Sequence, residues 1–235
     1  MKVTLVELLN YEGWISGLGT DREWRVQAIQ HRLYSELQEA VAGQGGFLIP
    51  MTFHHMLIIA NGIDRDGHGK IFDAMKSISP VPYRASSGTG RTLVRAEIEA
   101  FRGLKGLAAG QAAFGEHDGS RLVAAHFDID SYLKRLESGT IVDGMAQVNN
   151  LIGLVNRLSD ELEGISVYLG GDNVVLFAGE DSLERLERFE PDSIKIGIGV
   201  ANNARDCMKL AAESLTFIRK FRGRPIKVMK HNDNP

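Results

Sequence analysis

Two short acidic strings in the second half of the chain carry the residue types best suited to binding a metal ion. They are Ala125–Asp130 (AHFDID) and Leu169–Asn173 (LGGDN), and each lies in apolar sequence typical of a β-strand. An Asp at the end of a buried strand is strongly destabilising unless it is paired or binds a cation. Asp128 and Asp172 therefore predict a site for a hard divalent cation on neighbouring strands. Mg²⁺ prefers one or two carboxylates plus substrate phosphates, which favours an enzyme acting on a nucleoside triphosphate.

The alternative is that both carboxylates have only local roles. Asp128 could cap a turn and Asp172 could be an ordinary hairpin residue, since Gly, Asp and Asn are common in turns. The Phe-Asp-Ile-Asp string at a suitable distance upstream favours the metal site. Backbone N–H groups after Asp128 could then hold phosphates. The residues we expect to contact the nucleotide around the two carboxylates are Phe127, Ile129, Asp130, Gly170, Gly171 and Asn173.

Four further side chains are candidates on their chemistry. Arg219 and Lys220, near the end of the last long helix, either complement the helix dipole or clamp the outer phosphates. Asn149, on the polar side of a long helix, either faces solvent or binds a purine edge, since its amide offers a donor and an acceptor. His54 is either a hydrogen-bonded histidine or a ligand or general base of the catalytic site.

The composition is that of an ordinary globular protein, with one large domain or two small ones. The chain has 235 residues, of which 43% are hydrophobic and 24% charged. A net charge of −3 gives no reason to expect duplex nucleic acid as a partner. The single cysteine, Cys207, excludes an internal disulfide and a Cys-rich zinc site. No signal peptide or membrane span is recognisable, so a cytoplasmic location is expected.

Hydrophobic periodicity predicts the same order of elements in both halves of the chain. In the first half the expected segments are a strand Val3–Leu9, a helix capped by Asp21 with its apolar stripe from Ile29 to Val41, strands Phe47–Met51 and Met56–Ala60, a helix Gly69–Ser77, an edge or irregular strand Pro80–Tyr83, a helix Thr89–Phe101 and a linker Gly103–Gly119. In the second half they are a strand Leu122–Asp128, a helix with its stripe from Val142 to Leu162, hairpin strands Ile165–Leu169 and Asn173–Ala178, a helix Ser182–Phe189, a strand Ile194–Val200, a helix Ala204 to about Arg222 that buries Met208, and a strand Ile226–Met229.

Each half therefore has the order βαββαβ plus a further helix, which predicts an α+β fold of tandem ferredoxin-like or palm domains, each an antiparallel sheet with helices on one face. We place the domains at residues 1–112 and 113–235. Aligning His54 with Asp172 brings the two hairpins together without a gap. The same alignment places Leu9 opposite Asp128, so the first half is expected to lack both acidic positions.

Six strings spread along nearly the whole chain resemble the archaeal GTP cyclohydrolase III family, which is related to GGDEF-type nucleotidyl cyclases. The strings are Asn10-Tyr11 with Trp14, Gln27 through Tyr34, Ile59 through Ile63, His126 through Ile129, Gly170 through Asn173, and Gly197 through Val200 with Ala204, Leu210-Ala211 and Leu215 through Arg219. The resemblance implies a tandem palm fold and a homo-oligomer. It also implies Mg²⁺, with two or more ions expected, and no organic cofactor.

The reaction that this resemblance implies is hydrolysis of GTP. Water opens the imidazole ring at C8, the formyl group stays on a formylamino-pyrimidine ribosyl monophosphate, and pyrophosphate is lost and appears as phosphate. The product would feed flavin and deazaflavin biosynthesis. On the same resemblance Asp128 and Asp172 would bind the metal, Asn149 would contact the base, and the backbone around Ile129 would bind the phosphates.

The chain departs from the family pattern in its first half, where the family has Asp at the end of the first strand and Phe-Asp-Asn in the hairpin. Here those positions hold Leu9 and Phe53-His54-His55. Leu offers no ligand and a neutral imidazole suits softer metals, so a hard-cation site is not expected in this half.

Two other functions are compatible with the sequence. A nucleotidyl cyclase or oligonucleotide synthase would use the same metals to activate a 3′-hydroxyl. A nucleotide-binding regulator derived from an enzyme would explain the changed residues of the first half. Ring opening alters the ultraviolet absorbance of the purine, cyclisation leaves it intact and releases pyrophosphate, and a regulator binds GTP without turnover.

Overall fold

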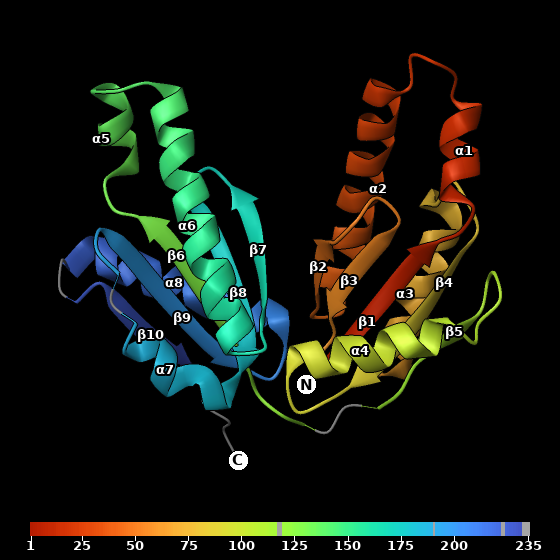
Figure 1. Ribbon diagram of the computed structural model, residues 1–235. Coiled ribbons are helices and arrows are strands. Elements are labelled where there is room, and N and C mark those ends of the chain that lie inside the picture. Colours follow the sequence, from red (N-terminus) through yellow and green to blue (C-terminus); the bar gives the residue numbers. More distant parts are fainter. Residues whose placement is uncertain (117–118, 190, 222–223, 232–235) are drawn as a thin grey trace. The chain divides into compact units, whose positions relative to one another are not determined.

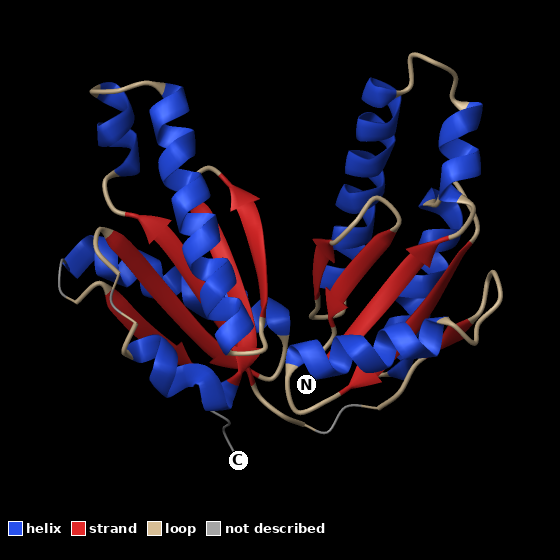
Figure 2. Ribbon diagram, viewed as in Figure 1, coloured by secondary structure: helices blue, strands red, loops and turns tan. Residues whose placement is uncertain are grey.

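The computed structural model describes residues 1–116, 119–189, 191–221 and 224–231. The chain divides into two compact units, which are unit 1 (Met1–Arg91 and Arg95–Gly119) and unit 2 (Thr92–Val94 and Ser120–Pro235). Each unit contains one five-stranded sheet with helices packed on it (Figures 1 and 2), as expected of an α+β fold. The boundary that we placed between residues 112 and 113 falls inside a short strand that still belongs to unit 1.

Unit 1 follows the expected βαββαβ order with additional helices. Its elements are β1 (Lys2–Leu8), α1 (Tyr11–Gly17), α2 (Glu23–Gly43), β2 (Phe47–Pro50), β3 (His55–Ile59), α3 (Arg65–Ile78), β4 (Tyr83–Thr89), α4 (Leu93–Leu104) and β5 (Ala112–Ala113). The sheet order is β2-β3-β1-β4-β5. The pairs β2–β3, β3–β1 and β1–β4 are antiparallel, whereas β5 is parallel to β4.

Unit 2 repeats this topology strand for strand. Its elements are β6 (Leu122–Ile129), α5 (Tyr132–Glu137), α6 (Ile141–Glu161), β7 (Ile165–Gly170), β8 (Asn173–Gly179), the 3₁₀ turn η1 (Glu180–Ser182), α7 (Leu183–Glu187), β9 (Ile194–Ala201), α8 (Ala204–Phe221) and β10 (Ile226–Lys230). Its order, β7-β8-β6-β9-β10, matches that of unit 1, and the last pair is again parallel. The predicted duplication is confirmed, while the prediction of wholly antiparallel sheets is wrong for the fifth strand of each unit.

Helices cover both faces of the unit 2 sheet, so the prediction that they occupy one face is wrong. Phe127 of β6 packs in a core with Val148 of α6 and Leu186 of α7. Helix α8 lies on the opposite face of the sheet (Figure 1), where a Cβ at Gly199 of β9 would come within 2.0 Å of the Cys207 carbonyl oxygen. Strand β6 is apolar at nearly every position, which is the pattern of a strand buried on both faces.

The residue-by-residue correspondence between the two halves of the chain also differs from the prediction. Glu7 pairs with His55 and Arg84, and Asp128 pairs with Asn173 and Lys195 at the corresponding places of the other sheet. Three residues later Asn10 and Ser131 both adopt left-handed backbone conformations, with φ of 53° and 57°. Glu7, not Leu9, is therefore the counterpart of Asp128, and unit 1 retains a carboxylate at this position.

Several local predictions need correction. Helix α2 begins at Glu23 with Arg22 at its N-cap, while Asp21 accepts a hydrogen bond from Trp24 Nε1 at 3.2 Å. Val142 is 77% exposed, because the first turns of α6 pack on α5 through the buried Gly144 and not on the sheet. Met208 of α8 is only half-buried.

Two other segments differ in their extent. The strand β4 extends from Tyr83 to Thr89 through small polar residues that we assigned to no strand, and it lies inside the sheet, not at its edge. Its hydrogen-bonded partners are β1 and the two-residue strand β5. Arg222, at the predicted end of the last helix, lies outside the described residues.

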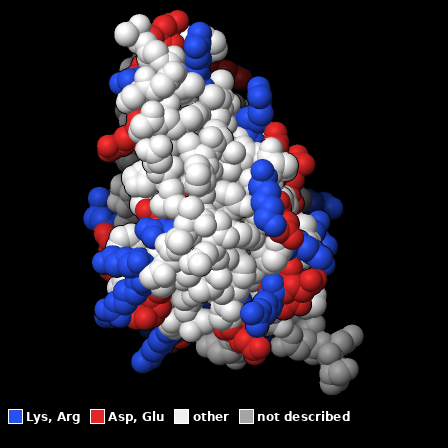
Figure 3. Space-filling model, turned by 90° about the vertical axis from the view of Figure 1, so that its right-hand side faces the viewer, with Lys and Arg blue, Asp and Glu red and all other residues white. Residues whose placement is uncertain are grey.

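The surface in Figure 3 is the face of unit 1 that lies on the right in Figure 1. Lys, Arg, Asp and Glu side chains are mixed along its margins, and uncharged residues form its centre. Charges of both signs are thus interspersed on this face, which does not present the single-sign field that steers polyanions. Within the described residues, none of the helices combines the length and apolar character needed to cross a bilayer.

A buried polar cluster joins β1 to the start of α3 in unit 1. His68 lies 2.8 Å from Thr4 through Nε2 and 2.7 Å from the Asp64 carbonyl oxygen through Nδ1. Lys2 Nζ donates to the Ile63 carbonyl oxygen at 2.9 Å. Burial lowers the pKa of His68 to about 4, so the ring is neutral in the folded protein at pH 7.

This cluster predicts a loss of stability in acid. Because His68 takes up a proton near pH 6.5 when unfolded and only near pH 4 when folded, the free energy of unfolding should fall by about 3 kcal/mol from pH 6.5 to below pH 4. Urea unfolding across this range should show a shallower pH dependence for His68→Gln than for the wild type. An equal slope in the two proteins would contradict the assignment, whatever their absolute stabilities.

Candidate metal and nucleotide site

Strands β6 and β8 bring the two predicted carboxylates together. Asp128, near the end of β6, pairs with Asn173, the first residue of β8, and Asp172 directly precedes it. The β7–β8 turn requires glycine, because Gly170 and Gly171 have φ of 104° and 60°, in the region that side chains with a Cβ rarely adopt. The Gly-Gly-Asp string thus makes the tight hairpin that holds Asp172 beside β6.

The two carboxylates influence each other. Asp128 is only 5% exposed. Burial, a side-chain hydrogen bond with Asp128 and the negative charge of that residue together raise the pKa of Asp172. Two adjacent carboxylates that repel each other in this way would be stabilised by a cation between them.

Arg219 of α8 compensates part of this negative charge. Its Nε donates to Asp128 Oδ2 at 3.1 Å, and its Nη2 contacts the same oxygen. The Arg219 side chain is half exposed, with the Asp128 carboxylate buried beneath it. Arg219 therefore holds one oxygen of Asp128 while its guanidinium remains accessible to an anionic ligand.

A cavity of about 700 Å³ lies beside Arg219, between the residues that follow β6, the start of β9 and the end of α8, and neither Asp128 nor Asp172 is among the residues that line it. This volume is within the usual range for small-molecule sites. Its lining combines three cationic side chains, Lys134, Lys195 and Arg219, with two carboxylates, Asp130 and Asp192, and with Ser131 and Ser193. Lys195 forms an ion pair with Asp130, and this hydrogen-bonded contact lowers the pKa of Asp130. The cavity thus offers cations and polar groups suited to phosphate.

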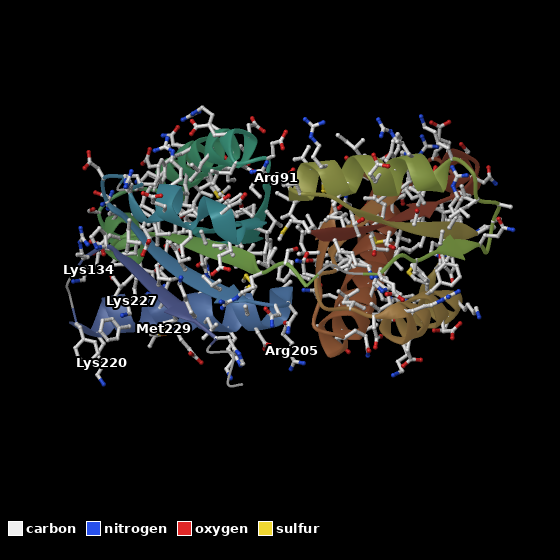
Figure 4. The ribbon with its side chains drawn as sticks, turned by 90° about the horizontal axis from the view of Figure 1, so that it is seen from below. Arg91, Lys134, Arg205, Lys220, Lys227 and Met229 are labelled. Atoms are coloured by element: carbon white, nitrogen blue, oxygen red, sulfur yellow. The ribbon has the colours of Figure 1, made fainter. Side chains whose placement is uncertain are left out.

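The other residues predicted for unit 2 have different positions. The Phe127 side chain is fully buried in the core, so only its backbone is available to a ligand. Asn149 is exposed on α6. Lys220 points outward from α8 (Figure 4), and its Nζ lies 5.3 Å from the centre of the Phe221 ring. Lys220 is not among the residues that line the cavity, whereas Arg219 is.

His54 belongs to unit 1 and directly precedes β3, as Asp172 directly precedes β8. It is exposed, and the centre of its ring lies 4.2 Å from the centre of the His55 ring and 6.1 Å from that of the Tyr11 ring. The nearby Glu7 accepts a hydrogen bond from Arg84 Nε at 2.7 Å, and one of its oxygens is 3.9 Å from His55 Nε2. Unit 1 therefore has one carboxylate, neutralised by arginine, where unit 2 has two.

Sequence reasoning did not single out Lys195 or His126 for this site. Lys195 lies directly opposite Asp128 on β9, a relation that follows only from the strand register. His126 lies two residues before Asp128, so both side chains point to the same face of the sheet. Burial lowers the pKa of His126, and its Nε2 is 2.9 Å from Asn173 Oδ1. The two-residue spacing of His126 and Asp128 could have indicated this, because it places both side chains on one face of a strand.

The donor set fits a hard cation. Within the described ranges, no group of three or more His, Cys, Asp or Glu side chains is arranged to hold a metal ion. A site built on the two carboxylates Asp128 and Asp172 therefore needs further oxygen ligands from water or from a bound phosphate. That is the arrangement Mg²⁺ favours, whereas structural zinc sites are closed by four protein ligands.

Comparison with known proteins places the chain in a family. The family model described as GTP cyclohydrolase III matches residues 1–231. The chain belongs to the GTP cyclohydrolase III family. It is 29% identical over 231 residues to the GTP cyclohydrolase III of Sulfurisphaera tokodaii, covering 97% of this chain and 98% of the relative. It is 32% identical over 224 residues to that of Saccharolobus islandicus strain M.16.27, covering 94% and 96%.

Solved structures with a similar fold are more distant from this GTP cyclohydrolase III family member. The GGDEF domain of DgcB from Caulobacter crescentus, in complex with c-di-GMP, is 14% identical with a TM-score of 0.38, covering 48% of this chain and 71% of that one. A class III adenylyl cyclase-like ATP-binding protein from Pseudomonas aeruginosa is 10% identical with a TM-score of 0.40, covering 98% and 83%.

Proposed function

We propose that the chain is a Mg²⁺-dependent GTP cyclohydrolase whose catalytic half is unit 2. Water attacks C8 of the guanine, the imidazole ring opens, and the formyl group stays on a formylamino-pyrimidine ribosyl monophosphate. A second water cleaves the bond between the α- and β-phosphates, a third hydrolyses the pyrophosphate to two phosphates, and the product is a precursor for flavin or deazaflavin synthesis. The observation that carries the proposal is the pairing of β6 with β8, which brings Asp128 and Asp172 together, with Arg219 joining Asp128 to the neighbouring cavity, in a chain of the GTP cyclohydrolase III family.

The residues around this pair divide into two roles. Asp128 and Asp172 would hold Mg²⁺, which when bound neutralises the charge of phosphate oxygens. Arg219, Lys195 and Lys134 would bind the phosphates from the cavity side, together with the backbone from Ile129 to Ser131. Asn149 remains our proposed base contact, and the homo-oligomer that the family resemblance implies remains a prediction.

Unit 1 is not assigned a metal ion in this proposal. Both Glu7 and Asp128 are paired with an arginine, but His54 stands where unit 2 has its second carboxylate, so unit 1 is not expected to bind a hard cation at this place. The change His54→Asp would restore the family residue beside Glu7. Additional Mn²⁺ binding by this variant would show that the exchange of this one residue removed a hard-cation site from unit 1.

The experiment that tests the proposal is an ultraviolet time course of the purified protein with GTP and Mg²⁺, coupled to phosphate detection, with EDTA as the control. Loss of purine absorbance together with phosphate release supports the ring-opening hydrolase. An unchanged spectrum with release of pyrophosphate would replace it with a nucleotidyl cyclase. GTP binding without any release would replace it with a regulator.

A further inference from the structure

A histidine is hydrogen-bonded to the β7–β8 hairpin next to Asp172. His126 is on β6, on the same face of the sheet as Asp128, and its Nε2 is 2.9 Å from Asn173 Oδ1. In the part of the chain that the structure describes, the other ring nitrogen, Nδ1, is buried without a hydrogen-bond partner. The hydrogen bond to Asn173 is therefore the contact whose purpose has to be explained.

The contact continues to Asp172. Asn173 Nδ2 donates to Asp172 Oδ1 at 3.2 Å and to the Gly170 carbonyl oxygen at 3.4 Å. Both of these partners are acceptors, so the amide nitrogen of Asn173 must face them and its oxygen must face His126. His126 is therefore the donor through Nε2–H. The result is one directed chain of hydrogen bonds, from His126 through Asn173 to Asp172.

Unit 1 shows that the palm fold does not need this chain. Leu5 occupies the place of His126, since Leu5 pairs with Leu57 and Ser86 where His126 pairs with Val175 and Gly197. His55 occupies the place of Asn173, and His54 that of Asp172. The hairpin of β2 and β3 forms all the same, with an apolar, buried residue at this position. The fold alone therefore does not require a hydrogen-bond donor at this position. The donor is present in the unit that has the second carboxylate.

We infer that His126 is a positioning residue which, through Asn173, fixes the orientation of the Asp172 carboxylate for metal binding. This inference rests on the proposed role of Asp128 and Asp172. Asn173 is tied to both Gly170 and His126, so its amide cannot rotate without breaking a hydrogen bond. Groups that orient a metal ligand typically contribute 10- to 100-fold to metal affinity or activity.

The test compares two substitutions at this position. His126→Leu copies the residue of unit 1 and removes the donor, whereas His126→Gln offers an amide nitrogen close to where Nε2 lies. We expect His126→Leu to weaken Mn²⁺ binding to the nucleotide-free protein, measured by electron paramagnetic resonance, by about 10- to 100-fold. The Mg²⁺ concentration needed for half-maximal turnover should rise in parallel, and His126→Gln should restore most of both. Melting temperatures identify any variant that has lost its fold.

A double-substitution cycle separates positioning from packing. If His126 acts through Asn173, then Asn173→Ala alone, His126→Leu alone and the double variant should all bind Mn²⁺ with similarly reduced affinity. Additive losses, or a His126→Gln protein as impaired as His126→Leu, would overturn the inference. Unaltered Mn²⁺ binding by a folded His126→Leu protein would do so as well. Asp172→Asn is measured alongside, and if it binds Mn²⁺ as tightly as the wild type, the proposed metal site fails instead.

Discussion

Asp172→Asn should reduce GTP turnover by about 10³-fold or more while leaving the protein folded. The substitution keeps the shape of the side chain but removes one of the two charges that would hold the metal. Metal-assisted charge stabilisation contributes several kcal/mol to such reactions, and about 4 kcal/mol corresponds to a 10³-fold change in rate. The same substitution should not destabilise the protein, because the raised pKa of Asp172 means that the folded state disfavours its negative charge.

The measurement is steady-state turnover at saturating Mg²⁺ together with thermal unfolding at pH 7. Asp181→Asn is a matched control, because Asp181 is an exposed carboxylate in the 3₁₀ turn η1, which follows the opposite end of β8. It should leave turnover within a few-fold of the wild type. Wild-type turnover in Asp172→Asn would refute the metal-site assignment. A variant that loses both turnover and its melting transition would show instead that Asp172 is needed to build the hairpin.

The parts of the site that could be predicted from the sequence are those fixed by local chemistry. Gly170 and Gly171 mark the hairpin because their positive φ requires glycine, and a following Asp must then lie at its tip. The strand before Asp128 could likewise be predicted from its own run of apolar residues. The cation at Lys195 was missed because its position beside Asp128 and Asp130 depends on the pairing of β6 with β9, which no local pattern specifies.

The register of β1 was wrong for a related reason. Side chains alternate along a strand, so a slip of two residues keeps every side chain on the same face and leaves the apolar pattern unchanged. Leu9 and Glu7 are thus equally acceptable counterparts of Asp128 by pattern. The left-handed conformations of Asn10 and Ser131 decide between them, and a left-handed serine has no reliable sequence signal. The position of α8 on the second face of the unit 2 sheet was missed because a glycine such as Gly199 in a strand does not by itself indicate close helix packing.

Gly199→Val should cause a large loss of stability in unit 2, and it tests this helix packing directly. A Cβ at Gly199 would lie 2.0 Å from the Cys207 carbonyl oxygen and 2.7 Å from the Ala211 amide nitrogen, both in the backbone of α8. Gly88 meets the backbone of α4 in the same way, at 2.2 Å from the Ala96 carbonyl oxygen, so the duplicated fold keeps this close approach in both units.

Overpacking a core usually costs about 1–3 kcal/mol and can cost more. Backbone atoms cannot rotate away as a side chain can, so we expect Gly199→Val to lower the free energy of unfolding by at least about 3 kcal/mol. Gly153→Ala on α6 is the contrasting change, since its Cβ would lie an ordinary 3.6 Å from Arg157 Nη1. It should raise the free energy of unfolding by about 0.5–1 kcal/mol through the higher helix propensity of Ala. Guanidinium unfolding of both variants makes the comparison, and a Gly199→Val protein as stable as the wild type would mean that α8 does not pack on β9 at this distance.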